Sequence, residues 1–129
     1  MNPRILVVDD TPLTRETLRL VLEADGYEVE VVEDPLEALE RLRSPSFQLL
    51  ITDYRMPGMT GFELLSIVRE EKIPCGVIVL TGHGDPQLAL DCMKAGADDF
   101  VAKPIDSTEL YNRVHACLGA RSRLLEIAP

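Results

Sequence analysis

The strongest constraint on the fold is a regular alternation of short apolar runs with longer segments of helical periodicity. Strands are predicted near residues 4–8, 28–32, 47–52, 76–81 and 98–102. Helices are predicted near residues 12–25, 35–43, 61–72, 86–95 and 106–118. Each connection between strands is long enough to return the chain for a parallel pairing. Five such units predict an α/β fold, in which helices cover both faces of a parallel sheet.

Capping signals mark most of the helix ends. A capping residue precedes a proline at three helix starts: Thr11-Pro12, Asp34-Pro35 and Asp85-Pro86. Two other helices begin with the spacing of a capping box, from Thr60 to Glu63 and from Asp106 to Glu109. Three glycines are expected to end helices: Gly26, Gly96 and Gly119.

The apolar runs also predict how the sheet is buried. Four of them are apolar nearly throughout, which is typical of strands buried on both faces. The run 28–32 alternates instead and predicts an edge strand. With 129 residues, 46% of them apolar, the chain suits one domain with a full core. We place that domain at residues 1–119 and expect residues 120–129 to be a tail or the start of a linker.

Composition excludes several classes of function. A net charge of −9 argues against nucleic acid as a direct partner, because phosphate backbones select basic surfaces. No segment approaches the roughly 20 apolar residues that span a membrane, and the first apolar run is too short for a signal peptide. The three cysteines lack C-x-x-C spacing, which favours buried thiols in a cytoplasmic protein: Cys75, Cys92 and Cys117.

Polar side chains that can bind a ligand or react with it follow the apolar runs. They end four of the five predicted strands: Asp9 and Asp10, Asp53, Thr81 and Gly82, and Lys103 and Pro104. In open parallel sheets, ligands bind beyond the carboxyl ends of the strands. We therefore expect these residues to form one site.

The expected site suits a phosphoryl group. Two carboxylates about 4 Å apart repel by roughly 4 kcal/mol at an effective dielectric constant near 20, so three acids require a cation. Oxygen ligands favour Mg²⁺ (or Mn²⁺). Lys103 offers a compact charge for phosphate, and Thr81 and Gly82 offer a hydroxyl and an open backbone amide. The carboxylate of Asp53 can act as the nucleophile that forms an acyl phosphate.

In combination, these motifs resemble the receiver domain of two-component response regulators over residues 4 to about 118. The resemblance rests on four motifs: Asp9-Asp10, Asp53 followed by Met56-Pro57-Gly58, Thr81-Gly82, and Lys103-Pro104 with Phe100 three residues before the lysine. It implies a flavodoxin-like (βα)5 fold, a doubly wound sandwich whose five parallel strands have the order 2-1-3-4-5.

The resemblance also implies roles for the site residues. Asp53 would accept phosphate from a histidine kinase or a histidine phosphotransfer protein. Asp9, Asp10 and Asp53 would hold Mg²⁺ together with the backbone carbonyl of Arg55. Lys103 would contact the phosphate, for which the backbone at Gly82 is a further contact, and Thr81 would turn toward it on activation.

The output of a receiver would follow from the same switch. Phe100 would swing inward and change the surface of the fourth helix, the fifth strand and the fifth helix, where a second copy or an output domain would dock. A cis peptide before Pro104 would set the direction of Lys103. Such a protein is a cytoplasmic signalling domain, which catalyses only its own phosphorylation and dephosphorylation.

Two other functions are alternatives to a phosphorylated receiver. One is a phosphate-independent pseudo-receiver that binds proteins, although no site residue is missing. The other is a phosphatase with an aspartate nucleophile, which needs a D-x-D-x-T/V motif that Asp9-Asp10-Thr11-Pro12 does not supply. A kinase is expected to dock on the first helix, near Leu13, Arg15 and Thr17. Arg55 and His83 are expected to flank the entrance to the phosphate.

Overall fold

The computed structural model describes residues 2–44, 46–82 and 86–127, the last five by their backbone alone. Strands and helices alternate along this part of the chain: β1 (Arg4–Val8), α1 (Pro12–Ala24), β2 (Glu28–Val32), α2 (Pro35–Arg43), β3 (Leu49–Asp53), α3 (Gly61–Glu70), β4 (Gly76–Thr81), α4 (Pro86–Lys94), β5 (Asp99–Ala102) and α5 (Ser107–Ile127). All strand pairings are parallel, in the order β2-β1-β3-β4-β5. The predicted fold and strand order are confirmed.

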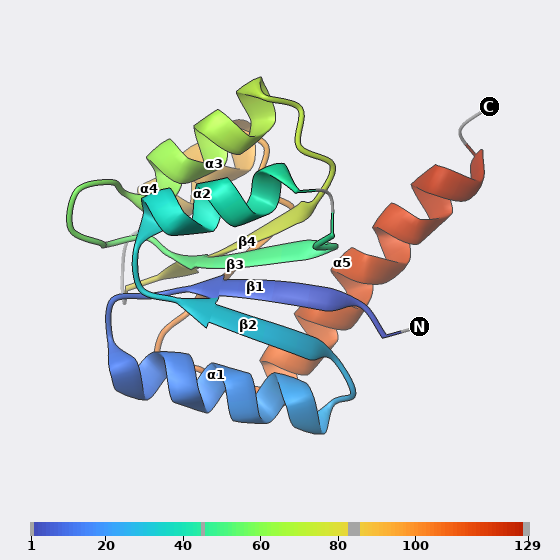
Figure 1. Cartoon of the computed structure of the whole chain (residues 1–129), viewed down its shortest axis with the longest axis horizontal. Coiled ribbons are helices and arrows are strands. Elements are labelled where there is room, and N and C mark those ends of the chain that lie inside the picture. Colours follow the sequence, from blue (N-terminus) through green and yellow to red (C-terminus); the bar gives the residue numbers. More distant parts are fainter. Residues whose placement is uncertain (1, 45, 83–85, 128–129) are drawn as a thin grey trace.

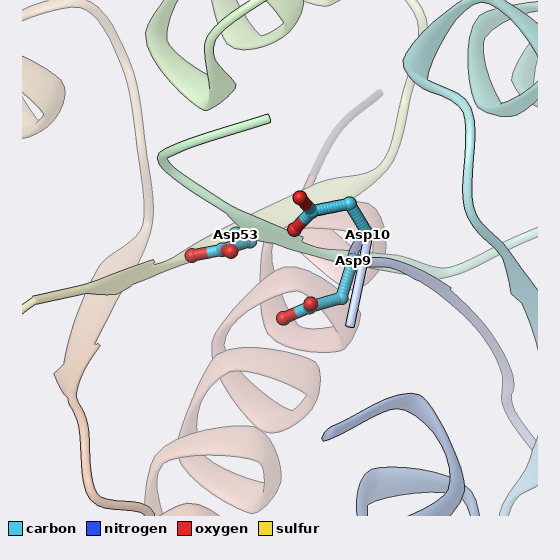
Figure 2. Close-up of side chains that lie close together, drawn as sticks. All are labelled: Asp9, Asp10 and Asp53. Carbon is cyan, nitrogen blue, oxygen red and sulfur yellow. The ribbon is translucent and has the colours of Figure 1, made fainter. Parts of the chain in front are cut away.

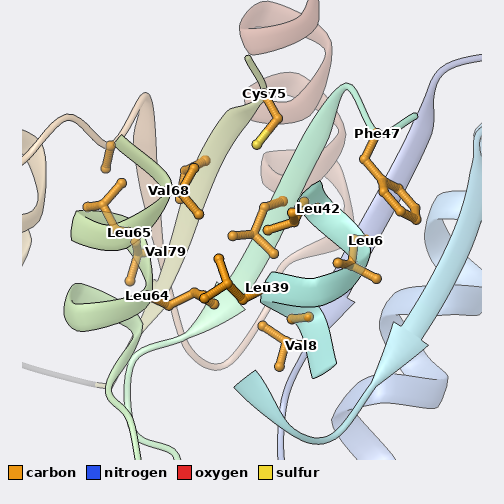
Figure 3. Packing of buried hydrophobic residues seen from close by; sticks show 14 of the residues in the cluster. Leu6, Val8, Leu39, Leu42, Phe47, Leu64, Leu65, Val68, Cys75 and Val79 are labelled. Carbon is orange, nitrogen blue, oxygen red and sulfur yellow. The ribbon is translucent and has the colours of Figure 1, made fainter. Parts of the chain in front are cut away.

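The sheet separates two apolar cores. Successive side chains of a strand point to opposite faces, so Leu6 and Val8 pack toward α2 and α3 whereas Ile5 and Val7 pack toward α1 and α5. Figure 1 shows α2, α3 and α4 on one face and α1 and α5 on the other. Figure 3 shows the first of these cores, where leucines of α2 and α3 meet the sheet. Full burial stabilises each such leucine by about 1.5–3 kcal/mol.

Most predicted helix starts are confirmed. The side chain of Thr60 accepts from the backbone N–H of Glu63 at 3.1 Å, and Glu63 accepts in return from the Thr60 N–H at 3.0 Å. Asp34 and Asp106 also cap their helices with side-chain oxygens. The predicted cap at Asp85 lies outside the described residues.

The start of α1 differs from the expectation. The Thr11 side chain forms no capping hydrogen bond, and the carboxylate of Asp9 accepts from the Thr11 N–H at 2.8 Å instead. The acid that ends the first strand therefore orders the first helix as well.

The last strand was predicted to be buried on both faces, and that prediction was wrong. β5 forms the second edge of the sheet, beyond β4, and Asp99 and Phe100 are only half-buried. A run as short as 98–102 is apolar enough for either position, because an edge strand still packs against helices on both faces.

The predicted stop at Gly119 was also wrong, because α5 continues as a helix to Ile127. Figure 1 shows this helix running past the end of the sheet at which the strands begin. A glycine inside a helix costs about 1 kcal/mol relative to alanine. Tertiary contacts beyond Gly119 offset that cost. None of the helices in the described residues is both long and apolar enough to cross a membrane.

The contacts that hold the end of α5 converge on Asp98. Its carboxylate accepts from Arg121 of α5 at 2.8 Å, from Arg69 of α3 at 3.0 Å and from the N–H of Val77 at 2.8 Å. Charge-assisted hydrogen bonds contribute about 1.5–3 kcal/mol each, which exceeds the cost of Gly119. We refer to Asp98, Arg69 and Arg121 as the Asp98 cluster.

The close approach of α5 to the sheet depends on Gly76. A Cβ atom at this position would lie 2.8 Å from Sγ of Cys117 and 3.0 Å from Cδ of Arg121. The missing side chain leaves the space through which Arg121 reaches Asp98. The cysteines Cys75, Cys92 and Cys117 are all buried, as expected.

We predict that Arg121→Ala loosens the end of α5. Loss of this part-buried ion pair should cost about 1.5 kcal/mol, so the amides of residues 119–127 should exchange with solvent roughly tenfold faster. The matched control is Arg113→Ala on the same helix, whose side chain is 45% exposed. Hydrogen exchange of these amides is the measurement, and equal rates in both variants would contradict the role of the Asp98 cluster.

Candidate functional site

Three carboxylates meet where β1 and β3 end. Asp9 is fully buried, Asp53 is 7% exposed, and Asp10 is exposed. One carboxylate oxygen from each lies within 4.8 Å of the other two. Figure 2 shows the three side chains gathered at the ends of their strands. The sequence prediction that these acids are neighbours is confirmed.

Lys103 reaches this acidic cluster from the end of β5. Its Nζ atom lies 3.2 Å from Oδ1 of Asp53 and 3.3 Å from Oδ2 of Asp9. Its backbone N–H donates to the carbonyl oxygen of Thr81 at 2.8 Å, which ties the loop after β5 to β4. The peptide bond between Lys103 and Pro104 is cis, as the resemblance implied.

The charges at the site are unbalanced. Burial raises the pKa of Asp53 and the nearby Asp9 carboxylate raises it further, while Lys103 opposes both. Burial lowers the pKa of Lys103, but attraction to Asp53 and Asp9 outweighs burial, so that the pKa is raised. Among the described side chains, Lys103 alone forms ion pairs with these acids, and it pairs with Asp9 and Asp53 but not with Asp10. One ammonium group leaves about two negative charges uncompensated.

A divalent cation fits this set of ligands. The donors are carboxylate oxygens, which suit Mg²⁺ or Mn²⁺, and two of the three are buried. A +2 ion would neutralise the charge that Lys103 leaves. The exposed Asp10 keeps one side of the cluster open to solvent and to an incoming group.

Thr81, Gly82 and Phe100 border a different space. Thr81 is 3% exposed at the end of β4, next to the strand that carries Asp53. With Phe100 and Ala102 of β5 it lines a groove of about 450 Å³, closed on the other side by apolar residues of α4. The structure thus brings Asp9, Asp10, Asp53 and Lys103 together and places Thr81 at the end of the neighbouring strand, where it lines the groove.

Arg55 lies on the open side of the acidic cluster. It is exposed and, with Asp10 and Thr60, lines a hollow of about 470 Å³. His83, expected opposite Arg55, lies outside the described residues. Arg15 was expected to face a kinase, but its guanidinium turns inward and donates to the backbone oxygen of Asp9 at 2.7 Å.

Gly61 is a site residue that the sequence pattern did not reveal. A Cβ atom there would lie 2.5 Å from the carbonyl oxygen of Asp53, closer than backbone atoms can tolerate. The Gly61 N–H also donates to the carbonyl of Tyr54 at 2.8 Å. The start of α3 therefore packs directly on the residue bearing the central carboxylate. The one sequence signal was a glycine immediately after the helix cap Thr60.

Comparison with known proteins decides the family. The family model of the response regulator receiver domain matches residues 5–115. This chain belongs to the receiver domain family. A receiver is a signalling domain of two-component systems, so the predicted class is confirmed.

Relatives of this receiver occur in longer regulators. The transcriptional regulatory protein FixJ of Bradyrhizobium diazoefficiens is 35% identical over 88% of the chain, which spans 56% of FixJ. The C4-dicarboxylate transport transcriptional regulatory protein DctD of Pseudomonas aeruginosa is 36% identical over 95% of the chain, which spans 27% of DctD. The chain therefore covers about half or less of these two proteins.

Solved structures share the whole architecture. A response regulator receiver domain protein from Clostridium thermocellum superimposes with a TM-score of 0.89 at 31% identity, covering 95% of this chain and 98% of the other. The crystal structure of FixJ-N gives a TM-score of 0.83 at 34% identity, covering 92% and 95%.

We predict that Asp53→Asn stabilises the metal-free receiver at neutral pH. Because burial and Asp9 raise the pKa of Asp53, the folded protein binds this proton more tightly than the unfolded chain, in which the pKa is about 3.9. Stability is therefore lost as pH rises through the interval from that value to the folded pKa. The variant should escape this loss, and its advantage should fade in acid.

Urea unfolding with a chelator, from acid to neutral pH, is the measurement. Asp98→Asn is the matched contrast, because two arginines compensate that carboxylate and its removal should destabilise the protein. A destabilised Asp53→Asn at neutral pH would show that Lys103 outweighs burial and Asp9.

Proposed function

We propose that Asp53 of this receiver accepts a phosphoryl group from a histidine kinase or a histidine phosphotransfer protein, with Mg²⁺ (or Mn²⁺) as cofactor. The observation that carries the proposal is the acidic cluster with Lys103 at 3.2 Å from Oδ1 of Asp53. A buried carboxylate with excess negative charge around it needs cations, and a bound divalent cation together with Lys103 would also offset the negative charge that a phosphoryl group brings.

The proposed transfer moves phosphorus from nitrogen to oxygen. A carboxylate oxygen of Asp53 attacks the phosphorus, the bond from phosphorus to the donor imidazole nitrogen breaks, and its electron pair stays on that nitrogen. A bound cation would neutralise part of the negative charge on the phosphoryl oxygens. Lys103 exchanges its contact with Asp53 for one with the phosphate. Water later attacks the phosphorus, the bond from phosphorus to the Asp53 oxygen breaks, and inorganic phosphate leaves, which restores the carboxylate. The receiver thereby catalyses only its own phosphorylation and dephosphorylation.

The remaining site residues receive roles by the same proposal. The buried carboxylates of Asp9 and Asp53 and the carboxylate of Asp10 would hold the metal, with the backbone carbonyl of Arg55 as a further ligand. The backbone at Gly82 would contact the phosphate, and Pro104 would fix the direction of Lys103. A pseudo-receiver is disfavoured because every one of these positions is occupied by a suitable residue.

The groove beside Thr81 supports a route to the output surface. When Thr81 turns toward the phosphate, it vacates one wall of the groove, and Phe100 can move inward from its half-buried position. This movement would change the surface of α4, β5 and α5, where Leu90 and Met93 are 47% and 38% exposed. A second copy or an output domain would dock there.

The setting of the domain completes the proposal. We place it in the cytoplasm, without direct contact to nucleic acid or membrane. Residues 1–119 form the receiver, and residues 120–129 are a tail or the start of a linker, although the helix itself continues across that boundary.

Phosphorylation by a small acyl-phosphate donor tests the proposal. In the presence of Mg²⁺, intact-mass spectrometry should show one added phosphoryl group on the wild type. Addition should vanish in Asp53→Asn and on chelation of the metal. Asp98→Asn, which removes a carboxylate just before β5, at the end of the strands away from the site, should still be labelled. Labelling of Asp53→Asn would refute the assignment.

The kinase-docking face is proposed on α1, where Leu13 lies in the first turn beside the site and is 76% exposed. Leu13→Ala should slow phosphoryl transfer from the kinase about tenfold, as loss of a central apolar contact does. Labelling by a small donor should not change. Leu20→Ala is the control, since Leu20 is 57% exposed two turns further along. Equal effects of both substitutions on transfer would remove the proposed face.

A further inference from the structure

Arg15, in the first turn of α1, is tied to the turn that carries the two leading acids. Its Nη1 atom donates to the carbonyl oxygen of Asp9 at 2.7 Å, and its side chain is only 18% exposed. That carbonyl belongs to the peptide group joining Asp9 to Asp10. The contact therefore fixes the direction in which the chain leaves Asp9 and the place at which Asp10 stands.

The polar atoms of Asp9 are held by several elements. Its N–H donates to the carbonyl of Val32 at 3.3 Å, and Oδ1 accepts from the N–H of Thr11 at 2.8 Å. Oδ2 accepts from Lys103 at 3.3 Å. Asp9 is thus fixed by its surroundings, whereas the exposed Asp10 depends on the turn. Repulsion among the three carboxylates favours movement of Asp10 away from its partners, and a hydrogen bond that holds the Asp9 carbonyl would oppose that movement.

We propose that Arg15 is a positioning residue of the metal site. By holding the Asp9 carbonyl, it keeps the Asp10 carboxylate within ligand distance of Asp9 and Asp53. The inference rests on the proposed Mg²⁺-dependent function and adds a residue to it. Substitution of a group that orients a metal ligand commonly lowers metal affinity by about 10- to 100-fold.

The charge of Arg15 and its hydrogen bond to Asp9 should affect Mg²⁺ affinity in opposite directions. Its guanidinium is positive, so removal of the charge alone would strengthen the attraction of a divalent cation. Removal of the hydrogen bond would weaken metal binding, because Asp10 would no longer be held near its partners. The sign of the change in Mg²⁺ affinity therefore separates the two effects.

Calorimetric titration of Mg²⁺ into the 129-residue chain tests the proposal. Arg15→Met should raise the Kd about tenfold, as loss of a group that orients a metal ligand does. Arg15→Lys should recover most of the affinity, because an ammonium can donate to the same carbonyl. Arg19→Met is the matched control: it removes the same charge from α1, and Arg19 pairs with Glu16 and Glu23 away from the site.

A kinetic measurement separates positioning from a general effect on folding. With a small acyl-phosphate donor, the Mg²⁺ concentration for half-maximal labelling should rise in Arg15→Met by the same factor as the Kd. The rate at saturating Mg²⁺ should match the wild type. Thermal unfolding with a chelator monitors the fold, and Arg15→Gln replaces the methionine variant if that one does not fold.

The outcomes distinguish this inference from the proposed function. Wild-type Mg²⁺ binding with equal or tighter binding in Arg15→Met would overturn the role of Arg15 alone. A lower saturating rate without a change in Kd would also overturn it. Absence of Mg²⁺ binding by the wild type would overturn the proposed function and the inference with it.

Discussion

The structure depends on the unbalanced charge at the carboxyl ends of its strands. Asp9 and Asp53 are buried with Asp10 beside them, and Lys103 alone among the described side chains forms ion pairs with the cluster. Such an arrangement is costly for a metal-free fold, since burial and a neighbouring acid both raise the pKa of Asp53. The apolar cores on both faces of the sheet hold the acids in place despite their repulsion. The metal-free fold is therefore less stable than it would be with balanced charges, and the site favours binding of a cation.

At the opposite ends of the strands, where β4 and β5 begin, a carboxylate is fully compensated by its partners. Asp98 is partly buried, and two arginines and a backbone N–H satisfy its carboxylate. That balanced cluster ties α3, β4, β5 and α5 into one unit. The two ends of the strands therefore differ: the charges of the Asp98 cluster are compensated within the fold, whereas the acidic cluster at the carboxyl ends keeps negative charge that can bind a cation. Because β4 and β5 run between them, a change at Thr81 occurs on strands anchored at their far ends.

Prediction from the sequence succeeded where a local pattern was repeated along the chain. Alternating apolar runs placed the strands within two residues, and the capping box at Thr60 was found from spacing alone. The acid cluster was found because parallel strands share one edge for their carboxyl ends. The pattern failed at Gly119, where the cost of a helical glycine is offset by Arg121 binding Asp98, a residue 23 positions away. It also failed for Arg15, whose helical position did not reveal that its guanidinium turns back to Asp9.

The sequence by itself determined the fold class and the chemical identity of the site, because periodicity and strand-end residues are local properties of the chain. The resemblance of its motifs supplied the strand order. Only the tertiary structure decided how long α5 is, why Gly61 and Gly76 have no side chain, and which cations compensate which acids. These features depend on distances between segments far apart in sequence, and small differences between burial, repulsion and hydrogen bonding settle them. No local pattern contains those differences.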